Sequence, residues 1–470
     1  MASEQPRASS KGRLAVLDER GSRLYAYPSE ASGRYTSRKQ WVHLLLLTIY
    51  LIVPFLTIND NPVLLLDIAN RRFVVLGKFF NAQDFYLSFF LVTGAGFTLI
   101  VLSSLFGRIW CGWACPQIVF LESIFRRVER WTEGTASQRR KLASAPWSLN
   151  KFARRTAKHS LYLTITLCVS NVFLAYFVSV PSLVEMMQRP PSQNWVAFLW
   201  MAGFSGLVYF NFYWFREQMC LVLCPYGRLQ SALQDPQTIL IGYDQHRGEP
   251  RGKVKNTAAG DCVDCKRCIS VCPTGIDIRE GFQFECIGCA KCIDACDDIM
   301  AKLGRNEGLV RYDSLRGLQG GVRRFWRPRI GFYLIAGILG SAVAVTMWLD
   351  NQSVEANVVR TFTAPYILDG SQVRNTFMVH VVNKHSMPTR LELKATPNQA
   401  LNITIPQPVI TLEVLDDHQL PVIVSQSLAA FAPGVRVHLD LTDDLTGETN
   451  RITTDFLGPD SPVEYRQPHE

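Results

Sequence analysis

The chain has 470 residues, of which 48 % are hydrophobic and 19 % are charged, and its formal net charge is +9. A chain of this length suggests about two to four domains. A positive net charge can indicate nucleic-acid binding, but the apolar residues here form long blocks and the basic residues flank them. The charge therefore marks the ends of membrane spans and argues against a nucleic-acid partner. No HExxH, P-loop, GxGxxG or nucleophile-elbow motif occurs, so hydrolytic and nucleotide-driven chemistry have no support.

Five apolar stretches predict membrane-spanning helices, each of which needs about 20 mostly apolar residues. The first stretch is short but holds no charge, and the polar segment before it has no small-residue cleavage site. We therefore expect an uncleaved anchor there and not a signal peptide. The five predicted spans are residues 41–57, 85–106, 159–180, 194–214 and 329–349.

Lys and Arg predict the orientation of these spans, because cytoplasmic loops are enriched in both. The 58–84 loop carries three such residues and the 181–193 loop carries one, whereas the other connections are densely basic. The predicted cytoplasmic segments are the N-terminus, 107–158 and 215–328, and everything after residue 349 is predicted to lie outside.

Two cysteine runs predict iron–sulfur clusters. Residues 262–273 read CVDCKRCISVCP and residues 286–297 read CIGCAKCIDACD. In two-cluster ferredoxins with this spacing, the fourth Cys of each run ligates the cluster of the other run. Zinc is the competing interpretation of CxxC pairs, but two complete runs fit cubane clusters better. We predict one 4Fe–4S cluster on Cys262, Cys265, Cys268 and Cys296, and a second on Cys286, Cys289, Cys292 and Cys272.

Asp297 stands where the first run has Pro273. This departure leaves the ligands intact but alters the local turn. A carboxylate at this position is expected to lower the potential of the cluster that uses Cys296, because reduction adds negative charge.

Two further elements have the pattern C-x₃-C-P. The first thiol element is RIWCGWACPQ at 108–117, with Cys111 and Cys115, and the second is MCLVLCPYGR at 219–228, with Cys220 and Cys224. A proline disfavours helix at the residue before it and suits the first position of a new helix. Each element therefore predicts a helix end, a bend and a fresh helix at the cytoplasmic membrane face.

These elements belong to an internal repeat of span, outer loop, span and C-x₃-C-P, over roughly 41–135 and 159–235. Packing the two units together is expected to gather four thiols beside the cluster runs. Thiolates select soft metals such as Cu(I), and a thiol pair can also cycle through a disulfide. The four are candidate copper or redox thiols, and hence the candidate catalytic residues. The alternative is that they are small packing residues, which is the interpretation we adopt for Cys168 in the third span.

Residues 350–470 contain no cysteine and consist of short alternating runs separated by Pro, Gly, Asn and Asp. This pattern predicts an immunoglobulin-like β-sandwich. Such a module more often docks a partner than performs chemistry, and a structural cap is the alternative. The candidate strands are 358–362, 376–382, 390–395, 402–405, 411–414, 422–424, 435–441 and 451–456.

The predicted fold is therefore a multi-domain membrane protein: a helical bundle of about five spans, a cytoplasmic two-cluster ferredoxin-like insert and a C-terminal all-β immunoglobulin-like sandwich. Its predicted parts are a cytoplasmic N-terminal segment at 1–40, a four-span membrane domain at 41–235, the ferredoxin-like domain at 236–328, a fifth transmembrane helix at 329–349 and the sandwich at 350–470.

The combination of both thiol elements, both cluster runs, GLVRYDS at 308–314 and a sandwich after a last span resembles the CcoG/RdxA/FixG family. These are accessory proteins tied to building the cbb3-type cytochrome c oxidase of bacterial inner membranes. The resemblance implies that Cu(II) is reduced to Cu(I) for delivery to the oxidase, which would make the chain a membrane oxidoreductase. It also implies that copper carriers or oxidase subunits are partners of the outer domain.

Two other functions stay open at this point. The membrane half is also similar to quinol-oxidising polyferredoxins of nitrate and nitrous-oxide respiration, which share the C-x₃-C-P repeat. The first alternative is thus a quinol dehydrogenase-type conduit, with quinone as a cofactor beside the clusters. The second is an assembly scaffold whose clusters sense redox state without turnover.

Overall fold

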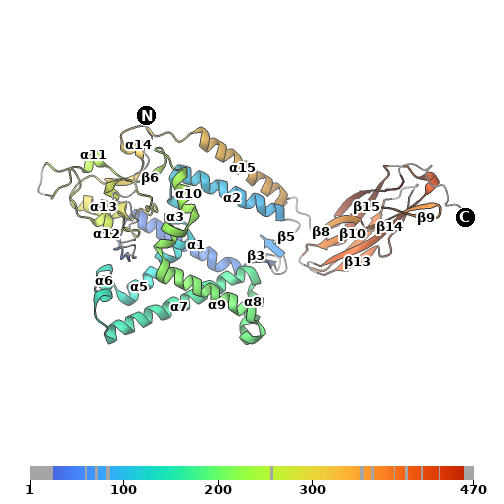
Figure 1. Ribbon diagram of the computed structural model, residues 1–470, viewed down its shortest axis with the longest axis horizontal. Coiled ribbons are helices and arrows are strands. Elements are labelled where there is room, and N and C mark those ends of the chain that lie inside the picture. The colour runs from blue at the N-terminus through green and yellow to red at the C-terminus, as the bar shows by residue number, and fades with distance from the viewer. Residues whose placement is uncertain are drawn as a thin grey trace. The chain divides into compact units, whose positions relative to one another are not determined.

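A computed structural model describes residues 25–58, 61–68, 72–80, 85–254, 258–349, 354–360, 365–385, 387–396, 401–413, 416–432 and 434–459. The chain divides into two compact units (Figure 1). The first unit comprises Met1–Leu56 and Tyr86–Val345, and the second comprises Thr57–Phe85 and Thr346–Glu470.

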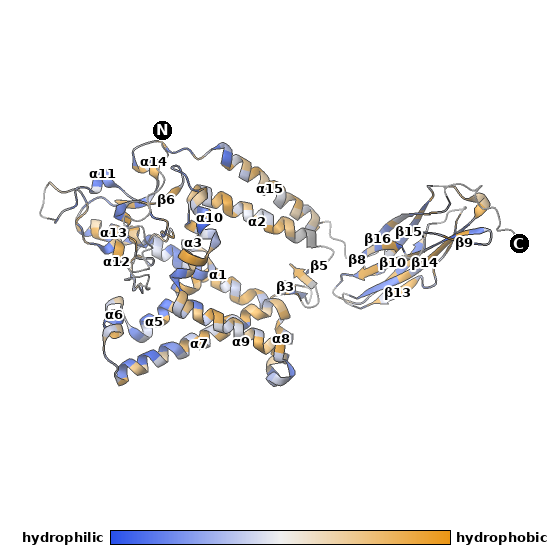
Figure 2. Cartoon of the chain, in the orientation of Figure 1, coloured by the Kyte–Doolittle hydropathy of each residue, from blue (hydrophilic) through white to orange (hydrophobic). Residues whose placement is uncertain are grey.

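Four helices of the described part are long and apolar enough to cross a membrane. Figure 2 shows most residues of these helices as hydrophobic, except in the first turns of the helix that begins at Leu149. Little of each apolar stretch is buried within the chain, as expected for a lipid-facing helix. These helices coincide with four of the predicted spans, although the third begins at Leu149 and not at residue 159. They are α2 (Phe85–Phe106), α7 (Leu149–Val178), α9 (Trp195–Phe210) extended by η5 (Asn211–Phe215), and α15 (Pro328–Leu349).

The first predicted span, 41–57, forms part of α1 (Arg34–Ile52), which is not among these four helices. Its first turns are basic, and Lys39 and His43 are buried. Its last turns pack along α7, where the Tyr50 hydroxyl donates to the Val169 carbonyl at 2.7 Å. The apolar stretch after His43 rises only about 14 Å, which is about half of a hydrocarbon core. The first half of helix α1 is therefore polar and partly buried, and its second half is a short apolar stretch.

The cluster region lies between two paired strands, β6 (Ile239–Tyr243) and β7 (Val310–Ser314), and GLVRYDS supplies the second of them. Helix α12 (Arg267–Ser270) lies within the first cysteine run, and α13 (Lys291–Lys302) begins within the second. Ile241, Ile293 and Met300 pack with Cys262 and Cys268 into one buried core. The elements after the thiol elements are α4 (Pro116–Phe120), η3 (Leu121–Phe125), α5 (Arg126–Glu133), α6 (Ala136–Ser144) and α10 (Pro225–Leu233).

The C-terminal part is a sandwich of two antiparallel sheets, which confirms the predicted all-β fold. Alternate residues of β10 are buried, including Val373, Phe377 and Val379, because one face of the strand packs on the opposite sheet. One sheet contains β8 (Val354–Arg360), β9 (Ile367–Asp369), β10 (Gln372–Asn383), β12 (Asn402–Thr404) and β14 (Asp417–Ser427). The other contains β11 (Thr389–Ala395), β13 (Val409–Leu412), β15 (Arg436–Asp443) and β16 (Thr449–Asp455).

Several strands differ from the sequence-based prediction. Strand β9 was not predicted, and residues 361–362 and 414 of two predicted strands lie outside the described residues. The 58–84 segment, predicted as a loop, contains two small sheets, and its Lys78 ammonium donates to the Trp348 carbonyl at 3.1 Å. Its strands are β1 (Thr57–Ile58), β2 (Asn61–Pro62), β3 (Leu64–Asp67), β4 (Arg72–Val75) and β5 (Lys78–Phe80).

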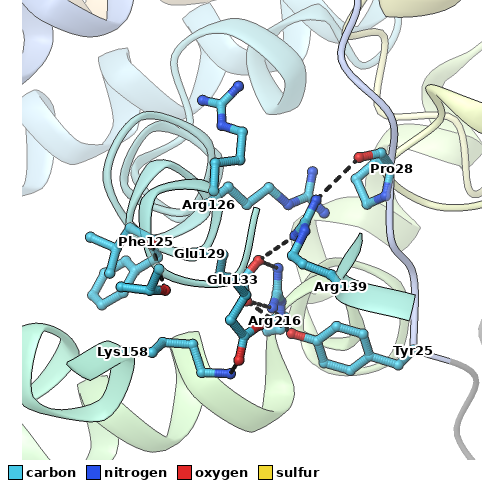
Figure 3. A network of polar contacts seen from close by, with 12 residues as sticks. Tyr25, Pro28, Phe125, Arg126, Glu129, Glu133, Arg139, Lys158 and Arg216 are labelled. Atoms are coloured by element: carbon cyan, nitrogen blue, oxygen red, sulfur yellow. Dashed lines mark hydrogen bonds and ion pairs between the residues drawn. The ribbon is translucent and has the colours of Figure 1, made fainter. Parts of the chain in front are cut away.

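A buried ion-pair network holds the two repeats together (Figure 3). The Glu129 carboxylate accepts from Arg216 Nη1 at 2.5 Å and from Arg139 Nη1 at 2.7 Å. Arg126 pairs with Glu217, beside Arg216. Burial raises the pKa of Glu217, but Arg216 and Arg126 outweigh it and hold that pKa below its ordinary value. The network joins the helix after the first thiol element to the residues just before the second.

Replacing Glu129 by Gln should destabilise the protein by about 3–5 kcal/mol, because the buried Arg216 and Arg139 would both lose their ion pair with this carboxylate. Denaturant titration of the purified protein in detergent measures the free energy of unfolding. Glu185→Gln is the matched control, since Glu185 pairs with Arg189 in an exposed position and should cost only about 0–1 kcal/mol. Equal stabilities for the two variants would contradict a structural role for the network.

Candidate functional site

Two cavities in the cluster region are lined by cysteine sulfurs. The first is lined by Cys262, Cys265, Cys268 and Cys296. The second is lined by Cys272, Cys286, Cys289 and Cys292, and Cys268 also contacts it. Each cavity thus gathers three cysteines of one run and the fourth cysteine of the other, which is the crossed arrangement expected of a two-cluster ferredoxin.

The loops between the cysteines have matching backbone geometry. Asp264 and Lys266 in the first run adopt φ values of 51° and 57°, and the equivalent Gly288 and Ala290 in the second adopt 68° and 62°. This left-handed conformation costs a non-glycine residue about 1–2 kcal/mol. Its repetition at equivalent positions indicates that both loops wrap the same kind of group. Four thiols around one cavity are the donor set that a 4Fe–4S cubane requires.

The two runs diverge after their fourth cysteine. Helix α12 ends at Ser270 before Pro273, whereas α13 continues through Asp297 to Lys302. Proline would break a helix at residue 297. The Asp297 carboxylate accepts from the Gly308 amide at 2.9 Å and also pairs with Arg34. The expectation that Asp297 lowers the potential of the cluster that uses Cys296 stays a prediction. The positive charge of Arg34 partly offsets the charge of this carboxylate.

The ligand arrangement differs from that of a zinc site, in which four ligands converge on one ion. Over the described ranges, no group of three His, Cys, Asp or Glu side chains is arranged to hold a single metal ion. The sulfurs instead surround the two cavities.

The thiol elements have the predicted local structure. Helix α3 (Ile109–Trp113) carries Cys111, while Cys115 is extended and Pro116 begins α4. In the second element the π-helical η6 (Met219–Leu223) carries Cys220, Cys224 is extended and Pro225 begins α10. The helix end, the bend and the fresh helix are therefore present in both.

Four thiols from these elements gather in one place, as predicted. Burial, together with the nearby thiols of Cys115, Cys111 and Cys224, raises the pKa of Cys220 to about 12. Burial also raises the pKa of Cys111, which the neighbouring Arg108 opposes. The Cys111 thiol donates to Gln230 Oε1 at 3.2 Å. None of the four forms a disulfide. We call them the four-thiol group.

The first thiol element packs directly on the second cluster loop, residues 286–292. A methyl group on Gly112 would lie only 2.6 Å from the Ile287 carbonyl oxygen and 2.8 Å from the Cys289 amide nitrogen. On the other side, a methyl group on Gly288 would lie 3.1 Å from the Arg108 carbonyl oxygen. Cys111 and Cys289 consequently belong to the same buried cluster of side chains.

Other side chains hold this contact, and the sequence alone did not single them out. Trp113 Nε1 donates to the Tyr312 hydroxyl at 3.1 Å, which donates to the Gly288 carbonyl at 2.6 Å. The Arg108 guanidinium donates to the Phe284 carbonyl. Their signal was present in the quoted motifs, because Arg108, Gly112 and Trp113 lie in RIWCGWACPQ and Tyr312 lies in GLVRYDS. Cys168, by contrast, is exposed on α7 and does not take the packing position expected of it.

Comparison with known proteins agrees with this site. Residues 215–315 match a family described as a 4Fe-4S dicluster domain, 87–133 match a 4Fe-4S binding domain, and 344–459 match the IG-like fold at the C-terminal of FixG. Protein RdxB of Cereibacter sphaeroides is 35 % identical, over 84 % of this chain and 88 % of that protein. The nitrogen fixation protein FixG of Rhizobium meliloti is 39 % identical, over 76 % of each chain. The chain belongs to the CcoG/RdxA/FixG family.

A solved structure, that of a FixG-related protein from Vibrio parahaemolyticus, also matches part of the chain. It is 17 % identical with a TM-score of 0.21, and covers 23 % of this chain and 97 % of that one.

Each thiol element lies inside a matched iron–sulfur segment, since Cys111 and Cys115 fall in 87–133, and Cys220 and Cys224 fall in 215–315. The protein is thus an iron–sulfur protein of this family, with four helices suited to a membrane.

Replacing Gly112 by Ala should loosen the second cluster loop, because the added methyl group meets backbone atoms that cannot turn away. We expect iron to fall from about eight to about four atoms per chain, which is the loss of one cubane. Iron and acid-labile sulfide are measured on anaerobically purified protein. Gly206→Ala is the control, since a methyl group there meets no atom within 4 Å. A full iron content in Gly112→Ala would show that the contact does not support the cluster.

The crossed ligand arrangement predicts the outcome of two single substitutions. Cys272→Ala should alter the EPR signal in the same way as Cys286→Ala, and Cys296→Ala in the same way as Cys262→Ala. These pairings follow from which sulfurs line each cavity. If Cys272→Ala instead resembled Cys262→Ala, each run would hold its own cluster.

Proposed function

We propose that this chain is an electron-transfer protein of the bacterial inner membrane that reduces Cu(II) to Cu(I) for assembly of a cbb3-type cytochrome c oxidase. The supporting observation is the packing of the first thiol element against the second cluster loop. Gly112 and Gly288 allow the two backbones to touch, so Cys111 and Cys289 share one buried cluster. A soft-metal donor set therefore lies next to a candidate redox centre.

The cysteines have distinct roles in this proposal. Cys262, Cys265, Cys268 and Cys296 would hold the first cluster, and Cys272, Cys286, Cys289 and Cys292 the second. When bound, such clusters supply one-electron transfer. Cys265 is exposed whereas Cys289 is buried beside Cys111. The exposed side of the first cavity is thus suited to meet an electron donor, and the second cavity faces the four-thiol group.

Copper is the substrate at the four-thiol group. Each Cu(II) takes up one electron, and the product Cu(I) is the ion that thiolates prefer. Because burial raises the pKa of Cys111, Cys115 and Cys220, metal binding must release protons from these thiols. Arg108 assists by stabilising the thiolate of Cys111, and Gln230 accepts from the same sulfur while it is protonated.

The proposed orientation places the cluster region in the cytoplasm and the sandwich in the periplasm. One contact and one feature of the domain division support it. The N-terminal segment and the cluster region, both predicted to be cytoplasmic, meet where the Thr36 amide donates to Asp294 Oδ2 at 2.6 Å. The 57–85 segment and the sandwich, both predicted to lie outside, belong to one compact unit. In this arrangement the sandwich would dock copper carriers or oxidase subunits.

The decisive experiment mixes dithionite-reduced, desalted protein with Cu(II) and a Cu(I)-specific chelator under anaerobic conditions. We expect about two Cu(I) per chain to form as the EPR signals of both reduced clusters disappear, because each cluster gives one electron. The variant Cys111→Ser/Cys115→Ser/Cys220→Ser/Cys224→Ser should keep its clusters but form Cu(I) at least about tenfold more slowly.

Cluster-free protein is the control for Cu(II) reduction by the thiols themselves. Cu(I) formation equal to that of this control would end the reductase proposal. An iron content near twelve atoms per chain would assign a third cubane to the four-thiol group and exclude it as the copper site. Quinol-dependent cluster reduction without Cu(I) formation would favour the quinol dehydrogenase alternative. Normal oxidase assembly in a strain lacking all eight cluster cysteines would favour the scaffold.

A further inference from the structure

A polar cavity of about 170 Å³ lies outside the cysteine sites, between the N-terminal segment, α1, the α4–α6 segment and α13. A single buried water needs only about 10–15 Å³, so the cavity admits a ligand of several atoms. Two acidic residues line it, Glu30 and Glu122, together with His43. The basic residues that line it are Lys39, Arg126, Arg127, Arg130, Arg139 and Lys291.

Most of these basic residues have carboxylate partners. Glu122 pairs with Arg126 and Lys291, Glu30 pairs with Arg130, and Arg139 pairs with Glu129 outside the cavity (Figure 3). Lys39 and Arg127 remain, since neither has an ion pair with a carboxylate within the part of the chain that the structure describes. Lys39 is only 3 % exposed, and it donates to the Cys289 carbonyl at the long distance of 3.4 Å. The Glu122 carboxylate is close enough to interact with Lys39, but it already pairs with Arg126 and Lys291. The buried ammonium is therefore only partly compensated, and a further anion in the cavity would stabilise it.

His43 supplies a second, independent sign of a ligand. Its side chain is buried at 2 % exposure, and its Nδ1 lies 2.7 Å from the Ser123 hydroxyl. The other ring nitrogen, Nε2, is buried without a hydrogen-bond partner among the described residues. If Nδ1 accepts the Ser123 hydrogen, Nε2 carries a hydrogen and can donate it to a ligand. Because buried donors are nearly always hydrogen-bonded, Nε2 is expected to meet an acceptor atom of a ligand.

We propose that this cavity binds a phosphate group. Its lining is rich in cationic donors, which suits charge-assisted hydrogen bonds to phosphate oxygens. An aromatic headgroup such as that of a quinol would need apolar walls, and here only Pro28 and Ala31 offer them. Lys39 or Gln40, together with His43, lies on one face of α1 and lines the cavity, so the helix presents more than one donor to the same ligand.

The phosphate could belong to free phosphate or to an anionic phospholipid. The lipid source fits the position of the cavity, because the residues of α1 that follow His43 are apolar and exposed, including Leu44, Leu45 and Ile49. Basic pockets at this level of a membrane protein suit anionic headgroups. Both sources share the phosphate chemistry and differ only in what is attached to it.

Binding is tested on full-length, cluster-loaded protein in detergent, by titrating inorganic phosphate against sodium chloride of equal ionic strength. We expect phosphate to raise the melting temperature and to give saturable calorimetric binding. Arg127→Gln/Arg130→Gln, which alters the cavity rim, should weaken binding at least about tenfold. Arg140→Gln is the control, because Arg140 is exposed on α6 and does not line the cavity. Lys39→Met is a second variant, with iron content and secondary structure checked first.

Nanodiscs distinguish the two sources. If discs of phosphatidylcholine with phosphatidylglycerol stabilise the protein more than phosphatidylcholine alone, and remove the effect of added phosphate, the ligand is a lipid headgroup. If phosphate acts equally in both discs, the ligand is free phosphate. The proposal is overturned if neither phosphate nor phosphatidylglycerol has any effect, or if the rim variant keeps the wild-type affinity.

Discussion

The close contact between the first thiol element and the second cluster loop is the constraint on which the rest of the site depends. Two glycines make it possible. Gly112 leaves no room for a side chain, and Gly288 adopts a φ of 68° with the Arg108 backbone beside it. Because the backbones touch, Cys111 and Cys289 lie in one group of buried side chains, which places the second cavity beside the four-thiol group. A side chain at either glycine would separate the two cysteine sets.

Buried charge fixes the relation between the two repeats. Arg216 is fully buried, and its guanidinium meets Glu129 from the helix that follows the other thiol element. A buried ion pair adds little net stability over an apolar pair, but its geometry tolerates few alternatives. The network therefore acts mainly on specificity, because it determines where Cys220 and Cys224 lie relative to Cys111 and Cys115. The same segment of α4–α6 forms one wall of the polar cavity, so the two features are structurally linked.

Much of the fold followed from local patterns. Hydropathy located four helices suited to a membrane, the proline after each thiol pair predicted the bend, and strict alternation predicted most sandwich strands. The prediction was less accurate for α1, whose Lys39 and His43 are buried, and for the 58–84 segment, which forms small sheets. Cys168, expected to be a packing residue, is exposed. The burial of Lys39 involves Cys289, which is far away in sequence, and periodicity cannot show such a contact. The small sheets of the 58–84 segment pair neighbouring strands instead.

The sequence by itself determined the chemistry of the site. The spacing of eight cysteines specified two crossed sets of sulfur ligands, and the duplicated C-x₃-C-P specified two further thiol pairs, because spacing and proline act over a few neighbouring residues. Only the tertiary structure decided which groups meet. It set Gly112 against the 286–292 loop, and it brought Lys39, His43 and Lys291 to one cavity from distant segments. Such contacts arise from packing and from compensation of buried charge, and these forces act between surfaces that exist only after the chain has folded.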